Sequence, residues 1–393
     1  MNTQETIELF DKYVIANYTR LGIVIVRGEG SRIWDADGRE YLDFFPGWAV
    51  SGVGHCHPAV VRRLQAQAAT LMHVANNFYM EGQGLLARQI SEHSFGGKCF
   101  FCNSGAEAVE AALKLARKYT PAGRYKIISM ENSFHGRTYA AITATAQPKY
   151  HAGFEPLPEG FTYVPYNDLS AVDEAIDGQT AAVIVEPIQG EGGINVADDD
   201  YLEGLRTLCN ERGVVLIFDE VQTGMGRTGE YFAWQHSGVA PDIMTLAKSL
   251  GGGMPIGAIE AKEPVAAAMT PGSHASTFGG NPLAAAAALG VFEAIEQEGL
   301  IENTRKMGAY LRAALETLAE KHSIIRQVRG KGLMLGMELS VPGAPIVSSC
   351  LEKGLNINCT HDTVLRVMPA MTVTADEIDC AIGIMGSCLA EVA

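Results

Sequence analysis

The sequence predicts an α/β protein: a large domain with a mostly parallel sheet flanked by helices, and a smaller α+β domain. Between about 98 and 280, short apolar runs alternate with helical stretches, which is typical of a parallel sheet covered on both faces. After about 285 the pattern changes to long helical stretches over 283–320, then RQVRGKGLMLGMEL and a short tail. We therefore expect a large domain over 46–285 and a small domain over 286–393. Alternating segments in 1–45 predict that this part packs with the small domain.

The predicted elements follow from hydrophobic periodicity. The run VVLIF at 214–218 is apolar on both faces, as buried parallel strands are. The expected strands are 125–130, 182–185, 214–218 and 243–246, and the expected helices include 107–119 and 200–211.

Composition restricts the possible functions. Of 393 residues, 47% are apolar and 19% charged, which favours a sizeable core over disorder. The formal net charge of -15 disfavours nucleic acid or an anionic membrane as a partner. The first residues lack a signal-peptide pattern, and the most apolar stretch, 283–295, is too short to span a bilayer. Eight scattered cysteines favour a reducing, cytoplasmic location.

Reactive side chains follow the expected strands. Asp219 directly follows one expected strand, Lys248 comes after Ala247 at the end of another, and Arg137 and Glu191 lie shortly after two more. The pair FF at 100–101 leads into a Ser-Gly turn that opens a helix. Because ligands of open parallel sheets bind beyond the carboxyl ends of the strands, we expect these groups to meet at one edge. Taken singly, each could be a solvated loop residue.

The turn NSGAE presents small residues at a helix N-terminus. Unpaired amides and the helix dipole there suit an anion. An ordinary N-cap by Ser104, with Glu107 in a capping box, explains the same residues equally well.

Two further motifs are set aside. GMGRTG at 224–229 matches the spacing of a dinucleotide fingerprint, but charged residues separate it from the preceding strand. GHCHP at 54–58 and CFFC at 99–102 contain metal-ligand residue types, but Cys99 and Cys102 would point to opposite faces of a strand. We expect no metal site.

A lysine nucleophile, a carboxylate, an anion-binding turn and arginines remain. Lysine forms Schiff bases with carbonyl groups, and this set matches the requirements of pyridoxal phosphate. At this point the chain resembles the class III aminotransferases of fold type I, within them most closely the members that act on acetylornithine in arginine biosynthesis. The resemblance runs from about residue 30 to 370, on the stretches GHCHP, FFCNSGAEAVEAALKLARK, SFHGRT, VEPIQGEGG, LIFDEVQTGMGRTG, AKSLGGGMPIGA, TFGGNPLA and VRGKGLMLG.

The resemblance implies a set of cofactor residues. It makes Lys248 the residue that holds pyridoxal 5'-phosphate and moves the substrate proton, and Asp219 the partner of the pyridine nitrogen. The other implied contacts are Gln222 at the ring hydroxyl, Phe134 on the ring face, Ser104, Gly105 and Ala106 at the phosphate, and Thr277 at the phosphate of a neighbouring subunit. The last of these implies a homodimer with its sites at the interface.

The resemblance also implies substrates. Arg137 is similar to the arginine that holds a carboxylate of acetylornithine and of glutamate, and Arg366 to the one that takes the glutamate α-carboxylate. Glu191 resembles the residue that pairs with Arg366 and leaves for glutamate. Further implied substrate contacts are Trp48, Tyr79 and Ser276. The expected reaction moves the δ-amino group of N2-acetyl-L-ornithine to 2-oxoglutarate, giving N-acetyl-L-glutamate 5-semialdehyde and L-glutamate.

Alternatives remain open at this stage. Ornithine, succinylornithine, 4-aminobutyrate or carrier-linked lysine could be the amino donor. From a different class, a non-catalytic metabolite-binding protein could use the same scaffold.

Overall fold

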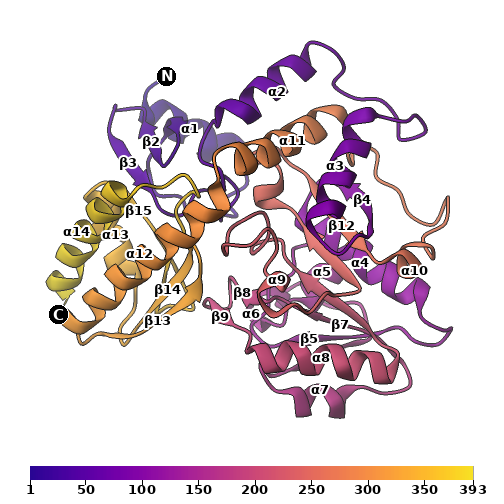
Figure 1. Ribbon diagram of the computed structural model, residues 1–393. Helices are drawn as coiled ribbons and strands as arrows, with labels where there is room; N and C mark the ends of the chain where they lie inside the picture. The colour runs from indigo at the N-terminus through magenta and orange to yellow at the C-terminus, as the bar shows by residue number, and fades with distance from the viewer. Residues whose placement is uncertain (393) are drawn as a thin grey trace.

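The computed structural model describes residues 1–392, whose largest unit is a seven-stranded sheet (Figure 1). Its strand order is β4-β12-β11-β10-β7-β5-β6. The strands are β4 (Lys98–Cys102), β12 (Gly257–Ala261), β11 (Ile243–Leu246), β10 (Val215–Asp219), β7 (Thr180–Val185), β5 (Lys126–Met130) and β6 (Phe161–Val164). Strand β12 is antiparallel to both neighbours, whereas β11, β10, β7, β5 and β6 run parallel. The predicted mostly parallel sheet is confirmed.

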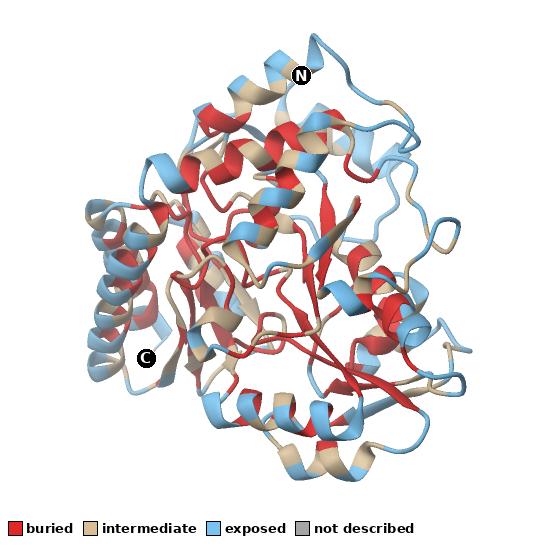
Figure 2. Ribbon diagram, turned by 45° about the vertical axis from the view of Figure 1, so that its right-hand side comes forward, coloured by how far each residue is buried: buried red, intermediate tan, exposed pale blue. Residues whose placement is uncertain are grey.

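Helices cover both faces of this sheet, so its strands β7, β10, β11 and β12 are buried along their whole length (Figure 2). In β7, Ala182 and Ile184 pack toward α4 (Gly105–Tyr119), while Val183 and Val185 pack toward α8 (Asp199–Arg212). This explains the unbroken apolar runs. The remaining helices of this part are α2 (Pro58–Ala68), α3 (Glu81–His93), α5 (Tyr139–Ala144), α6 (Pro148–His151), α7 (Leu169–Ala175), α9 (Trp234–Ser237) and α10 (Glu263–Ala266).

The elements predicted from periodicity lie within two residues of their observed bounds. The expected long helical stretches over 283–320 are two helices, α11 (Pro282–Gln297) and α12 (Leu300–Lys321). They are separated at Gly299, whose φ of 61° is left-handed and suits glycine. Strands β12 and β6 are not among those predicted.

The C-terminal part is built on a four-stranded antiparallel sheet, β13-β14-β17-β16. Its strands are β13 (Ile325–Lys331), β14 (Met334–Leu339), β16 (Asn358–Thr360) and β17 (Val364–Val367), and α12, α13 (Ala344–Glu352) and α14 (Ala375–Val392) accompany it. Leucine, isoleucine and methionine side chains from these elements form one continuous core.

The N-terminal strands join the C-terminal part through a second sheet. After α1 (Thr3–Tyr13) come β1 (Ile25–Glu29), β2 (Arg32–Asp35) and β3 (Glu40–Asp43). Strand β3 pairs in parallel with β15 (Leu355–Asn356), more than 300 residues later in the chain. A two-stranded ribbon, β8 (Ile188–Gln189) and β9 (Asn195–Val196), completes the strands.

The domain borders remain a prediction. The proposed border at 285 falls inside α11, which packs on α2 and α3. Arg227 of the GMGRTG segment is 1% exposed and donates through Nη1 to the Leu333 and Met368 carbonyls, both at 3.4 Å.

In the described part of the chain, no helix is long and apolar enough to cross a bilayer.

Candidate active site

A cavity of about 330 Å³ lies at the carboxyl ends of β4, β5, β7, β10 and β11. Parallel strands deliver their end residues to this edge, as expected from the sequence. The predicted residues that line it are Ser104, Gly105, Ala106, Phe134, Glu191, Asp219, Gln222 and Lys248.

Lys248 begins a short 3₁₀ turn directly after β11. Its φ of 46° is left-handed, a strained conformation for a residue with a Cβ and one that concentrates at functional sites. The next residue fixes the turn, because Ser249 Oγ donates to the Ala49 carbonyl at 2.7 Å. Burial lowers the pKa of Lys248 against the opposing effect of nearby carboxylates, chiefly Glu191 and Asp219. A lysine with a lowered pKa is a better nucleophile.

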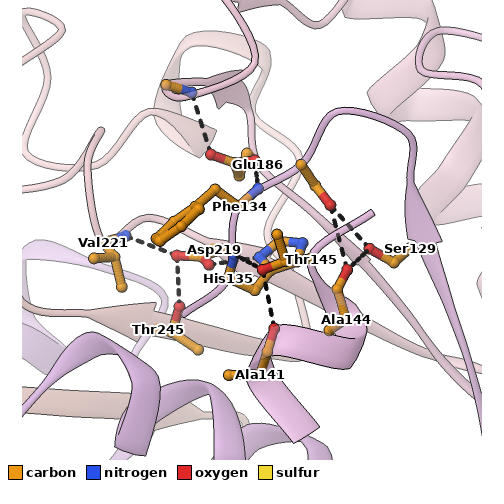
Figure 3. A network of polar contacts seen from close by, with 12 residues as sticks. Ser129, Phe134, His135, Ala141, Ala144, Thr145, Glu186, Asp219, Val221 and Thr245 are labelled. Carbon is orange, nitrogen blue, oxygen red and sulfur yellow. Dashed lines mark hydrogen bonds and ion pairs between the residues drawn. The ribbon is translucent and has the colours of Figure 1, made fainter. Parts of the chain in front are cut away.

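Asp219, the last residue of β10, is held by three donors (Figure 3). Its Oδ1 accepts from the Val221 amide and the Thr245 hydroxyl, both at 3.0 Å. Its Oδ2 lies 2.7 Å from Nδ1 of His135. An ionised carboxylate only accepts hydrogen bonds, so His135 donates from Nδ1. The buried His135 Nε2 has no partner within residues 1–392.

His135 was not among the predicted site residues. It lies in SFHGRT, one residue after Phe134, and its contact with Asp219 spans 84 positions of the chain. Local pattern carries no signal for such a pairing.

Glu186 was also missed, although it directly follows β7. It is 5% exposed and lines the cavity. Its Oε2 accepts from the Phe134 amide at 3.0 Å and its Oε1 from the Gly190 amide at 3.2 Å (Figure 3). Burial raises the pKa of Glu186 to about 7. The Glu186 carboxyl therefore links the loop that carries Phe134 to the loop that carries Gly190 and Glu191.

The NSGAE turn forms the predicted N-cap, whereas the predicted capping box is not formed, because Glu107 does not accept from the Ser104 amide. Ser104 is the N-cap of α4, with Oγ accepting from the Glu107 amide at 3.2 Å. Glu107 in turn accepts from the Asn103 amide at 2.6 Å. The first amides of a helix have no intrahelical acceptor, and those of Gly105 and Ala106 line the cavity. The cap therefore leaves an anion-binding turn in place.

Glu191 and Arg366 form an ion pair beside this cavity. Arg366 Nη1 donates to Glu191 Oε1 at 2.6 Å, and Nη2 donates to Oε2 at 3.3 Å. The Arg366 side chain is 1% exposed. Burial acts to raise the pKa of Glu191, but Arg366 outweighs it and holds that pKa below its ordinary value.

Arg137 lies outside this cavity. Its guanidinium carbon lies 4.0 Å from the ring centre of Tyr150 and 5.5 Å from that of Phe134. It lines a second cavity with Tyr18 and Tyr139, so Tyr18 is a neighbour that the sequence did not indicate.

Four other predicted residues also lie outside the main cavity. Trp48 is 51% exposed and packs edge-on to Phe45, with ring centres 5.9 Å apart. Tyr79 is fully exposed. Ser276 Oγ accepts from Asn103 Nδ2 at 3.1 Å, in a hollow that it shares with the exposed Thr277. Their implied roles remain predictions.

The family model described as Aminotransferase class-III matches residues 13–389. The chain belongs to this family, and it is an enzyme, a pyridoxal-phosphate-dependent aminotransferase.

Its relatives agree. The chain is 53% identical to the acetylornithine aminotransferase of Caldanaerobacter subterraneus subsp. tengcongensis, over 97% of this chain and 98% of that protein. It is 52% identical to the acetylornithine aminotransferase of Methanocaldococcus jannaschii, over the full length of both. Among solved structures it resembles the ornithine aminotransferase of Toxoplasma gondii, with a TM-score of 0.95 and 36% identity over 100% of this chain and 96% of that chain. The acetylornithine aminotransferase of Elizabethkingia anophelis has a TM-score of 0.89 and 35% identity over the full length of both.

Proposed function

We propose that this enzyme transfers the δ-amino group of N2-acetyl-L-ornithine to 2-oxoglutarate, using pyridoxal phosphate at the main cavity. The observation that carries the proposal is that Lys248, Asp219 and the first amides of α4 share one cavity, with the Glu191–Arg366 pair beside it. The relatives at about half identity support acetylornithine as the amino donor.

The residues present fit pyridoxal phosphate. An amine, a carboxylate and an anion-binding turn match its aldehyde, ring nitrogen and phosphate. Gln222 also lines the cavity, and its buried Oε1 has no partner among the described residues. When bound, this cofactor supplies an aldehyde that takes up an amino group and a ring that withdraws electrons.

Each of these side chains has a physical task. Lys248 would hold the cofactor and, once released, accept a proton from the substrate carbon, for which a lowered pKa is suited. Asp219, oriented by His135 and Thr245, would keep the ring nitrogen protonated. Phe134 would cover one ring face, with its backbone held by Glu186.

The two substrates differ in where they carry carboxylates. When Glu191 is paired with Arg366, the charge of the arginine is compensated and needs no substrate carboxylate. The ω-amine end of acetylornithine, which carries no carboxylate, can then approach Arg366. When Glu191 leaves, Arg366 can bind the α-carboxylate of glutamate or 2-oxoglutarate through two parallel hydrogen bonds. Arg137, whose guanidinium stacks on Tyr150 in this structure, would turn toward the main cavity to bind the carboxylate at the other end of either substrate.

We also propose a homodimer. Thr277 and Tyr79 are exposed in the single chain, as residues that serve a partner's site would be. The neighbouring Met72, Phe78 and Phe278 are exposed large apolar side chains, which is typical of an interface. The acidic composition and scattered cysteines support a cytoplasmic location.

The decisive experiment compares amino donors with the purified holoenzyme. Half-reaction rates are measured for acetylornithine, ornithine, succinylornithine and 4-aminobutyrate by following the cofactor absorbance. Acetylornithine should be the fastest by a clear margin, and a faster rival would replace it as the substrate. A protein that takes up no pyridoxal phosphate, and stays colourless, would contradict the whole proposal.

A further inference from the structure

The Arg366 guanidinium has two acceptors besides Glu191: the Gly190 carbonyl, which lies 3.4 Å from Nη1, and the side chain of Asn358. Its Nε donates to Asn358 Oδ1 at 2.9 Å, and its Nη2 donates to the same oxygen at 2.5 Å. Arginine has only donors, so the amide oxygen of Asn358 must be the atom that faces it. The Nη1–Nη2 edge of the guanidinium thus meets Glu191, and the Nε side meets Asn358.

Strand register explains this contact. Asn358 in β16 lies directly opposite Arg366 in β17, and directly opposite residues of an antiparallel pair share a face. Two positions along β16, Thr360 lies on the same face and its hydroxyl donates to the Glu191 carbonyl at 2.7 Å. One face of β16 therefore holds the side chain of Arg366 and the main chain of Glu191.

The guanidinium is also covered on its flat face. Its Cζ lies 4.6 Å from the ring centre of Phe45. Phe45 covers the flat face of the guanidinium and Asn358 occupies its Nε side. The Nη1–Nη2 edge is therefore the part that binds a carboxylate, which here is that of Glu191.

We propose that Asn358 is a positioning residue for substrate carboxylates: it keeps the guanidinium of Arg366 oriented after Glu191 leaves. This inference rests on the proposed exchange of Glu191 for a substrate carboxylate. The proposal also requires that the side chain of Asn358 is uncharged. A fixed carboxylate at this position would compensate the charge of Arg366 permanently, whereas an amide holds the group and leaves its charge for the substrate.

The test uses the holoenzyme with three single substitutions. Asn358→Ala removes the acceptor. Asn358→Asp keeps the size and the oxygen but adds a charge. Asn356→Ala is the matched control, because it removes a hydrogen bond of the same residue type, from Nδ2 to Asp43 Oδ1 at 2.8 Å, away from Arg366.

Two readouts separate positioning from general damage. Calorimetry measures the Kd of glutarate, a dicarboxylate that cannot react. Single-turnover kinetics measures the 2-oxoglutarate and amino-donor half-reactions separately. Thermal unfolding and cofactor absorbance verify that each variant is folded and loaded.

Asn358→Ala should raise the Kd of glutarate and the KM for 2-oxoglutarate about tenfold, the size of one charge-assisted hydrogen bond. The maximal rate and the amino-donor half-reaction should stay within about twofold. Asn358→Asp should weaken glutarate binding at least as much, and Asn356→Ala should leave it unchanged.

Unchanged glutarate binding in Asn358→Ala, or equal losses in both half-reactions, would overturn the inference. Wild-type behaviour of Asn358→Asp would overturn the argument about charge. These outcomes are distinct from a failure of the proposed function, which would appear in the wild-type enzyme as a preference for another amino donor.

Discussion

Gly257, the first residue of β12, lies close to the anion-binding turn. A substitution there tests whether the seven-stranded sheet and the turn must be this close. A Cβ built there would lie 2.2 Å from the Ser104 carbonyl oxygen and 2.8 Å from Cys102 Sγ. Ordinary contacts of this kind begin at 3.4 Å, so Gly257→Ala requires the strand and the turn to separate by about 1 Å. The Ser104 oxygen belongs to the same peptide group as the Gly105 amide, so the substitution displaces the site that would bind phosphate.

Overpacking of this kind costs about 1–3 kcal/mol. We expect Gly257→Ala to lower the free energy of unfolding by that amount and to weaken pyridoxal phosphate binding on the order of tenfold or more. Denaturant titration of the cofactor-free protein gives the first quantity, and titration with pyridoxal phosphate followed by absorbance gives the second.

Gly84→Ala is the matched control. Gly84 lies within α3, and a Cβ there has nothing within 4 Å. This variant should be more stable by up to about 1 kcal/mol, because alanine is the better helix former. If Gly257→Ala binds the cofactor as tightly as Gly84→Ala, the turn is not the phosphate site or the contact is not tight.

Four other substitutions test the site and the core. Lys248→Ala should abolish turnover and change the absorbance spectrum of the bound cofactor, and an active variant would refute its role. Arg366→Ala should raise the KM for 2-oxoglutarate about a hundredfold, because a buried bidentate pair is lost, and should raise the KM for acetylornithine less. Arg137→Ala should weaken the binding of both substrates. If steady-state kinetics show that each variant loses equally on both substrates, the exchange of Glu191 is contradicted. Glu220 is 1% exposed, and burial raises its pKa from an ordinary value of 4.5 to about 7. The folded state therefore binds the proton more tightly, so this stabilisation is complete below about pH 4.5 and is lost as the pH rises through about 7. Denaturant titrations between pH 5 and 8 should show the stability of the wild type falling by up to about 3 kcal/mol relative to Glu220→Gln, and parallel pH profiles would refute the assignment.

The sheet and its reactive edge could be predicted because they depend on local pattern. An apolar run followed by Asp219 or Lys248 is enough to place a strand and what it delivers. Strand β12 could not be predicted in the same way. Its sequence GAIEA is short and interrupted by the buried Glu260, and its place between β11 and β4 depends on β4, which lies far away in the chain.

The site residues that were missed share one property: no pattern in their own stretch of sequence indicates their partners. The contact of His135 with Asp219 and that of Asn358 with Arg366 each depend on which strands become neighbours. Arg137 was expected at the sheet edge because it follows a strand, but stacking on Tyr150 directs its guanidinium to another cavity. Sequence indicates which residue types follow a strand, whereas packing decides where their side chains point.

The pairing of β3 with β15 has a consequence for the order in which the protein can fold on the ribosome. Every strand of the seven-stranded sheet lies between Lys98 and Ala261, so this sheet can be complete while the last third of the chain is still being synthesised. Strands β1 to β3, although made first, must wait until Asn356 has emerged before their sheet can close. A newly made chain therefore carries an unpaired N-terminal edge for most of its synthesis, which makes that edge a natural place for chaperone binding.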